Sequence, residues 1–146
     1  MGIAMAIPAQ LHIVTLGVAD LNRSATFYDA LGWQRSSASN DNIIWFKLAG
    51  AVLGLFPRHE LAEDASVPEA GSGFTGVTLA INLESREAVD AAFADAAAAG
   101  ATITKPGTEA VWGGYSGYFA DPDGHLWELA FNPFFPISPE GLLQLP

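Results

Sequence analysis

The pattern of apolar and polar positions in the first part of the chain predicts a strand, a helix and three further strands. Residues 11–19 alternate in part, which is typical of a strand with one apolar face. Asp20 can cap the next segment, where apolar residues recur at helical spacing until Gly32 ends the pattern. Three short strand-like runs follow, at 33–38, 43–49 and 51–57. The order of the expected elements up to residue 57 is therefore βαβββ.

The same order of elements is expected again between residues 74 and 133. Residues 74–83 alternate between large apolar and small or polar side chains, as a strand does. Ser85 can cap an alanine-rich helix that runs to Ala99, and Gly100 is its stop signal. Strand-like runs recur at 101–105, 112–120 and 125–131. The second half of the chain therefore repeats βαβββ.

A short repeat of letters accompanies this repeat of elements. Val14-Thr15-Leu16 recurs as Val77-Thr78-Leu79 at the same point of the second half, which favours internal duplication over chance. Neither half can bury its apolar face well alone, so the two modules should pair and their sheets should enclose a shared concavity. We therefore predict an α+β fold in which two βαβββ modules form a curved mixed sheet around a shared cleft.

The expected organisation is a single domain over residues 1–146, with modules at about 11–57 and 74–133. Residues 58–73 are polar and contain Pro and Gly, so they are predicted to form a linker or surface loop. The tail 134–146 is too apolar to be a free extension. We expect the tail to pack against its own domain or a second subunit.

Composition narrows the classes of partner. Sixteen acidic and six basic residues give a formal net charge of −10, which disfavours nucleic acid and anionic membrane surfaces as partners. The chain has no cysteine, which removes disulfides, thiolate metal sites and cysteine nucleophiles. Neither a signal peptide nor a membrane-spanning run is recognised, so we expect a cytoplasmic protein.

Three stretches resemble a known superfamily. They are "VTLGVADLNRSATFYDALGW" (14–33), "SREAVDAAF" (85–93) and "GGYSGYFADPDGHLWELAFNP" (113–133). Together they resemble the vicinal oxygen chelate superfamily, which includes glyoxalase I, bleomycin-resistance proteins and extradiol dioxygenases. The likeness covers nearly the whole chain outside the loop 58–73 and the tail. It is specific for the fold, but the superfamily hosts several chemistries.

The resemblance implies four strand positions that hold a divalent metal in metal-using members. In this chain those positions carry Ile13, Gly54, Thr78 (Gly76 by the simple repeat offset) and Glu128. Only Glu128 keeps a ligand, and one carboxylate does not hold a catalytic zinc or iron. We therefore predict no cofactor and no metal site of the usual kind. A divalent metal is disfavoured, but a shifted register or ligands from a partner chain would restore a site.

Strand alternation groups small and polar residues on one face of the expected sheet. They are Ile13, Thr15, Gly17, Gly54, Thr78, Ala80, Asn82 and Glu128. Most of these residues are small or polar, whereas their neighbours along the strands are large and apolar. Such a difference is typical of a ligand cleft, and a face that is simply hydrated would have the same composition. Glu128 is our candidate for a recognition carboxylate or a catalytic general base, with Thr15, Thr78 and Asn82 as hydrogen-bonding neighbours.

Aromatic residues beside glycine-rich backbone are candidate walls for a planar ligand. We single out Trp45, Trp112 and Tyr115 as ligand-binding residues, and of Tyr118 and Phe119 only one can face the cleft. Asp121, Asp123 and His125 are interpreted as turn and surface residues.

Three functions from different classes remain. The first is metal-independent binding of a small organic ligand, planar aromatic ligands included, as in the drug-sequestering members that the chain resembles. The second is a divalent-metal-dependent lyase or dioxygenase of the same superfamily. The third is a structural or regulatory dimer with a vestigial cleft. The expected partners are a small molecule and, from the superfamily's habit of pairing modules, a second copy of the chain.

Overall fold

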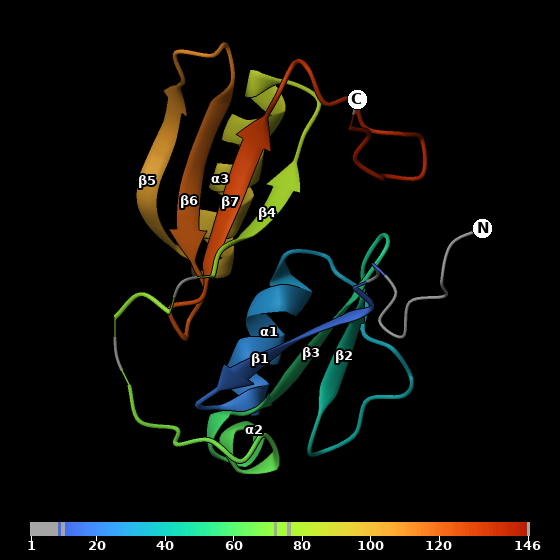
Figure 1. Ribbon diagram of the computed structural model, residues 1–146, viewed down its shortest axis with the longest axis vertical. Helices are drawn as coiled ribbons and strands as arrows, with labels where there is room; N and C mark the ends of the chain where they lie inside the picture. The colour runs from blue at the N-terminus through green and yellow to red at the C-terminus, as the bar shows by residue number, and fades with distance from the viewer. Residues whose placement is uncertain (1–8, 10, 72, 76, 146) are drawn as a thin grey trace, which may run out of the picture.

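A computed structural model describes residues 9, 11–71, 73–75 and 77–145 of the chain. Figure 1 shows two modules, each with a sheet and a helix packed against it. The elements are β1 (Ile13–Val18), α1 (Leu21–Ala30), β2 (Ile44–Lys47), β3 (Val52–Pro57), α2 (Arg58–Asp64), β4 (Leu79–Asn82), α3 (Arg86–Ala99), β5 (Thr102–Glu109), β6 (Tyr115–Ala120) and β7 (Leu126–Phe131). In the part of the chain that the structure describes, no helix is long and apolar enough to cross a membrane.

Each module has its own sheet, and the two sheets have corresponding strand orders. The first sheet is ordered β1-β3-β2, with β1 parallel to β3 and β2 antiparallel to it. The second is ordered β4-β7-β6-β5, with the same mixture of one parallel pair and antiparallel pairs. An isolated bridge from Arg35 to Phe46 stands where β5 stands in the second module. The predicted α+β fold is confirmed, and the strands of its two modules form two separate mixed sheets.

Both main helices begin and end where the sequence pattern predicts. The Asp20 side chain accepts a hydrogen bond from the backbone N–H of Arg23, and the Ser85 hydroxyl accepts one from Ala88. Helix α3 ends at Gly100, whose φ of 107° is the left-handed conformation that glycine adopts without a steric cost.

Several of the predicted elements differ from the structure. Among its described residues, the segment 74–83 forms a strand only at Leu79–Asn82, and the strand expected at 112–120 begins at Tyr115. The strand expected at 33–38 is reduced to the single bridge at Arg35. Ser36 N–H donates to the Trp45 carbonyl and Lys47 N–H donates to the Gln34 carbonyl, and the chain then turns at 37–38. The loop expected at 58–73 opens with α2, which follows Pro57 directly and carries Glu60 in its first turn. A proline before the first turn and an acidic residue within it both favour a helix start, and the polar composition of the segment masked them.

One hydrophobic core joins the two modules. Tyr28, Phe46, Leu53 and Phe119 are fully or almost fully buried, and each such side chain stabilises the fold by about 1.5–3 kcal/mol relative to exposure. Helix α1 crosses the boundary, since the ring of Phe27 lies 6.3 Å from that of Phe119 on β6. The modules therefore bury the helix-covered faces of both sheets in a common core, which neither could complete alone.

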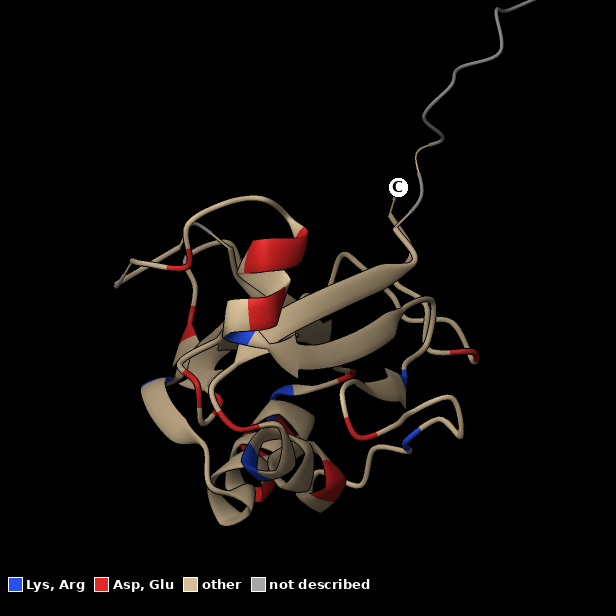
Figure 2. Cartoon of the chain, turned by 90° about the horizontal axis from the view of Figure 1, so that it is seen from below, with Lys and Arg blue, Asp and Glu red and all other residues tan. Residues whose placement is uncertain are grey.

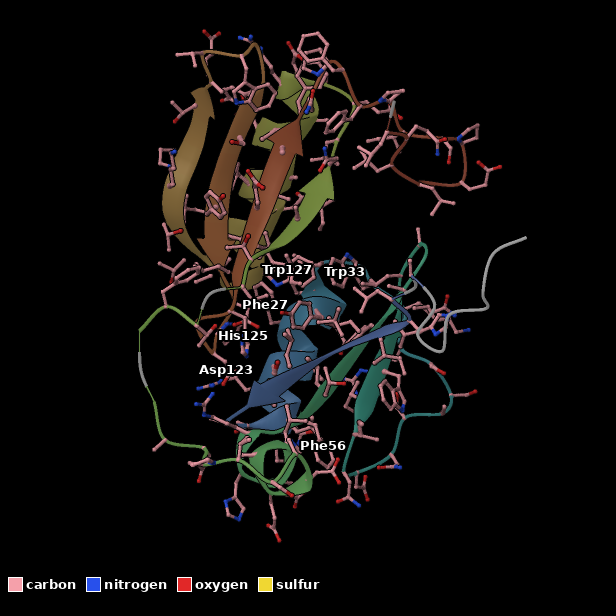
Figure 3. All side chains as sticks on the ribbon, in the orientation of Figure 1. Phe27, Trp33, Phe56, Asp123, His125 and Trp127 are labelled. Atoms are coloured by element: carbon pink, nitrogen blue, oxygen red, sulfur yellow. The ribbon has the colours of Figure 1, made fainter. Side chains whose placement is uncertain are left out.

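A hydrogen-bonded network at the β6–β7 turn (residues 121–125) also ties the modules together. The buried Asp121 carboxylate accepts a hydrogen bond from the Tyr28 hydroxyl at 2.7 Å, and that hydroxyl accepts one from Trp127 Nε1 at 3.1 Å. Asp123 Oδ1 accepts the backbone N–H of Ala19 at 2.8 Å and pairs with the Arg23 guanidinium. Figure 3 shows Asp123 beside the end of β1.

The turn residues thus have a structural role that their sequence pattern did not indicate. His125 Nε2 lies 2.8 Å from the Gly17 carbonyl oxygen, so the imidazole contacts β1 instead of remaining at the surface. The Asp-Pro-Asp-Gly sequence forms a turn, as predicted. Its carboxylates and the following histidine bind the second module to β1 and α1 of the first.

Candidate functional site

The two sheets leave one face each uncovered by their own helices, and we call these the open faces. On β3, Leu53 and Leu55 point into the core, so Gly54 between them belongs to the open face. On β7, Trp127 and Leu129 are buried, so Glu128 is on the open face of the second sheet. These two positions correspond in the repeat.

On the first sheet the open face carries a tryptophan stacked over glycine. Thr15 and Trp45 are the strand neighbours of Gly54 on either side. A Cβ atom on Gly54 would lie 2.5 Å from Trp45 Cζ3 and 3.3 Å from Thr15 Oγ1, so the indole ring covers the glycine. Because any side chain at position 54 would collide with the ring, the position of the Trp45 indole depends on glycine there. The result is a flat apolar surface with one hydroxyl beside it.

On the second sheet the open face carries a carboxylate beside a phenol. Tyr118 is the cross-strand neighbour of Glu128, and Ala80 is its neighbour on β4. Burial raises the pKa of the Tyr118 hydroxyl, and the negative charge of Glu128 and a hydrogen bond to it raise that pKa further. The phenol therefore stays protonated at neutral pH and can donate to the carboxylate, which keeps further capacity to accept hydrogen bonds.

Tyr118 is the site residue that the sequence prediction left unassigned. The signal was available, because the turn at 121–125 joins two antiparallel strands and places residue 118 opposite residue 128. Sequence alternation alone could not decide whether Tyr118 or Phe119 faced inward. The structure buries Phe119, with 1% exposure, and turns Tyr118 to the open face.

The structure does not bring all of the proposed ligand-binding residues together. Trp112 lies in the turn between β5 and β6, is 49% exposed and folds over Gly114. Tyr115 lies on the helix side of β6, where its hydroxyl donates to Asp90 on α3 at 2.6 Å. Neither residue is on the open face with Glu128.

The two remaining candidates lie on or next to β4. Thr78 immediately precedes β4 and is exposed. Asn82 is the last residue of β4 and is half-buried. Asn82 pairs in register with Ala130 of β7, two positions beyond the Ala80–Glu128 pair, so it belongs to the same open face.

The residues present do not fit the metal site implied by the superfamily. Ile13, Gly54 and Thr78 offer no side-chain ligand, and the indole of Trp45 fills the space above Gly54. Among the residues whose structure is described, no group of three or more His, Cys, Asp or Glu side chains could hold a metal ion. Glu128 is therefore one carboxylate without the partners that a bound zinc or iron needs.

Two grooves follow the boundary between β1 and β4. The first, the loop groove, has a volume of about 810 Å³ and lies between β1, the β6–β7 turn and the loop before β4. The second, the tail groove, has a volume of about 570 Å³ and lies between β4, the β2–β3 turn and the C-terminal tail. Val14 and Leu79 line both grooves, so the two lie along one seam. Both volumes are in the range of small-molecule sites.

The proposed site residues are divided between these features. Thr15 lines the loop groove, and Asn82 lines the tail groove. Trp45 and Glu128 line neither groove and lie on the open faces. Trp45 and Glu128 therefore distinguish a ligand on the open faces from a ligand in a groove, whereas Thr15 and Asn82 could contact either one.

Comparison with known proteins places the chain in a family. Residues 10–129 match the model of the Glyoxalase/Bleomycin resistance protein/Dioxygenase superfamily. A glyoxalase-related enzyme from Fulvimarina pelagi is similar in structure, with a TM-score of 0.85 and 36% identity over 94% of this chain and 99% of that one. A glyoxalase/bleomycin resistance protein/dioxygenase from Nocardioides has a TM-score of 0.72 and 26% identity, covering 88% of this chain and 86% of its own.

A glyoxalase/bleomycin resistance protein from Albidiferax ferrireducens has a TM-score of 0.62 and 27% identity, covering 84% of this chain and 98% of its own. No curated protein matches the sequence significantly. The family model covers most of the chain, and the similar structures extend over both modules. The chain therefore belongs to the glyoxalase/bleomycin resistance protein/dioxygenase superfamily, also called the vicinal oxygen chelate superfamily.

Proposed function

We propose that this protein binds a small organic ligand on the open faces of its sheets without a metal ion. The observation that carries the proposal is the indole of Trp45 lying over Gly54. In metal-using relatives this strand position supplies a ligand to the ion. In this chain position 54 is glycine and the indole ring of Trp45 lies over it. The site therefore offers an aromatic surface for stacking at the place where a metal ligand would otherwise lie.

The chemistry of the open faces suggests the kind of ligand. Trp45 offers a flat apolar surface, and Thr15 beside it offers a hydroxyl that can donate or accept. Glu128 is a hydrogen-bond acceptor with Tyr118 as its neighbour, so it favours a ligand that carries an N–H or O–H donor or a positive charge. We propose a planar aromatic ligand that is neutral or cationic. In this proposal Glu128 recognises the ligand, and its action as a general base remains a prediction.

A ligand screen with site variants tests this proposal. Thermal shift against a library of neutral and cationic aromatic compounds identifies binders, and calorimetry measures their affinities for Trp45→Leu and Glu128→Gln. Loss of stacking should weaken binding about threefold to tenfold in Trp45→Leu. Glu87→Gln is the matched control, because Glu87 is exposed in the first turn of α3. Binders that have the same affinity for the wild type and for Trp45→Leu would contradict the proposal.

We also propose that the protein forms a homodimer. Large apolar side chains of the C-terminal tail are exposed, including Phe134 at 65% and Leu145 at 66%. Leu11, which precedes β1, and Ile13, its first residue, are 67% and 49% exposed. Burial of such side chains against a second copy would stabilise a dimer. Light scattering after gel filtration measures the mass directly. A mass of two chains supports the dimer, and a mass of one chain at micromolar concentration contradicts it.

A further inference from the structure

The tail groove has features of a second ligand site, separate from the open-face residues Trp45 and Glu128. We propose that it binds an aromatic carboxylate, with the apolar body between the modules and the carboxylate at Lys47 and Asn82. Both residues line the groove from opposite modules, Lys47 from the end of β2 and Asn82 from the end of β4. A ligand that contacts both would bridge the seam.

The walls of the tail groove are aromatic and aliphatic. Trp33 and Trp127 line it and lie edge to face, with ring centroids 5.5 Å apart. Figure 3 shows the two indoles side by side at the boundary between the modules. Trp33 also stacks on the buried Tyr28, at 5.3 Å between centroids, which fixes its ring. Trp127 is only 4% exposed, so it holds Trp33 in place. The half-buried ring of Trp33 is the aromatic surface that a flat ligand would contact, at a small cost in side-chain entropy.

The C-terminal tail forms the outer wall of the groove. Ile137 and Leu143 pair as an isolated antiparallel bridge, which closes the tail into a small hairpin. Leu142 Cδ2 would lie 3.2 Å from a Cβ on Gly50, so the hairpin rests on the β2–β3 turn of the other module. Both Leu142 and Leu143 line the groove and are 44% exposed. The groove is thus bordered by residues of both modules, and its leucines keep apolar surface for a ligand.

The charge of the groove differs from the charge of the protein. Three of the six basic residues, Arg23, Arg35 and Arg86, are in ion pairs with carboxylates. Among the described residues no carboxylate lies within 4.0 Å of the Lys47 ammonium, and the tail groove has no acidic residue among those that line it. Figure 2 shows acidic residues far outnumbering basic ones over the chain. The net negative charge of the protein repels anions in general, but in the tail groove an anion would be attracted by the Lys47 ammonium.

Asn82 is a second polar residue in the lining of the groove. Its side chain is half-buried, and in the described part of the structure it has no side-chain hydrogen bond. A carboxamide offers two N–H donors, and a carboxylate can accept from them and from an ammonium together. A carboxylate within reach of both side chains would therefore be bound more tightly than a neutral group of the same shape.

Titration with 2-naphthoate, followed by ¹H–¹⁵N NMR on the full chain, tests this proposal. We expect saturable binding that shifts the Asn82 side-chain amide and the Trp33 indole N–H. Lys47→Met keeps the aliphatic stem and should raise the Kd about threefold to fivefold. Lys105→Met is the matched control, since Lys105 is exposed on β5 and lines neither groove. The neutral analogue 2-naphthalenemethanol should bind Lys47→Met and the wild type equally.

A second variant keeps the test decisive. Leu142→Glu adds a carboxylate to the wall and should weaken binding of 2-naphthoate more than that of the alcohol. Equal effects of Lys47→Met and Lys105→Met would overturn the proposal, as would shifts that centre on Arg58 and His125 in the loop groove. The absence of saturable shifts at millimolar 2-naphthoate would overturn it too. Loss of binding in Trp45→Leu or Glu128→Gln would instead place the probe on the open faces.

Discussion

Removal of the Tyr28 hydroxyl should destabilise the protein more than removal of any hydroxyl at its surface. In Tyr28→Phe the ring remains, so no large cavity forms, but the buried Asp121 carboxylate loses a donor at 2.7 Å. Trp127 Nε1 loses its acceptor at 3.1 Å. Burial and the nearby charge of Asp121 raise the pKa of Tyr28 well above its ordinary value, so the hydroxyl is a permanent donor in the wild type.

The magnitude follows from these two contacts. A hydrogen bond to a charged group contributes about 1.5–3 kcal/mol, and a buried donor without a partner costs about 1–3 kcal/mol. The two effects share one hydroxyl, and Asp121 Oδ1 still accepts two backbone N–H groups, from Asp123 and His125. We therefore expect a loss of about 3 kcal/mol in the free energy of unfolding. That is a large fraction of the roughly 5–15 kcal/mol typical of a domain.

Urea unfolding at pH 7, followed by far-ultraviolet circular dichroism, measures this loss. Tyr115→Phe is the control, because it removes a hydroxyl that also donates to an aspartate, but at the surface. We expect a much smaller change in the control and equal urea dependence in both variants. If Tyr28→Phe lost no more stability than Tyr115→Phe, the network would not join the modules as we describe.

Three further predictions concern the open faces and the second sheet. The Tyr118 hydroxyl should ionise at a higher pH than free tyrosine, and Glu128→Gln should lower the pKa of Tyr118, as measured by absorbance at 295 nm. The protonated hydroxyl stabilises the fold below about pH 10, and this contribution is lost as the pH rises through the folded-state pKa of Tyr118. Equal titration of Tyr118 in the wild type and in Glu128→Gln would contradict the prediction. Gly117→Ala would force a Cβ against a backbone carbonyl of β5 and should cost about 1–3 kcal/mol in thermal unfolding; an unchanged melting temperature would refute this. Gly54→Ala should displace the indole of Trp45 and alter tryptophan fluorescence, and an identical spectrum would show that the ring does not cover the glycine.

Local signals in the sequence predict much of this fold. Asp20, Ser85 and Gly100 act within one turn of the chain, so they mark the ends of α1 and α3 without knowledge of the tertiary structure. The repeated order of elements predicts two corresponding sheets. Strand alternation assigns Glu128 and Gly54 to the same face of their sheets, opposite the buried leucines and Trp127.

The remaining features depend on contacts between distant residues. Asp121 and His125 have ordinary turn composition, and only the packing of the β6–β7 turn against β1 and α1 makes them a link between modules. Tyr115 and Tyr118 lie on opposite faces of β6, and alternation alone does not say which face each occupies, because both faces of β6 accept aromatic residues. The face of Tyr118 follows only when its pairing with Glu128 across the turn is taken into account. The tail groove likewise arises from six segments that are separated in the chain.

Metal stoichiometry tests the central claim, a ligand site that works without a metal ion, most directly. The untagged protein is stripped with chelator and dialysed against zinc, nickel, manganese and ferrous iron, and bound metal per chain is counted by elemental analysis. Our account predicts far less than one ion per chain for each metal, unchanged in Glu128→Gln, because the described residues of one chain form no group of three or more ligands around Glu128. Binding near one ion per chain that is lost in Glu128→Gln would contradict it and would indicate the metal-dependent chemistry of the superfamily.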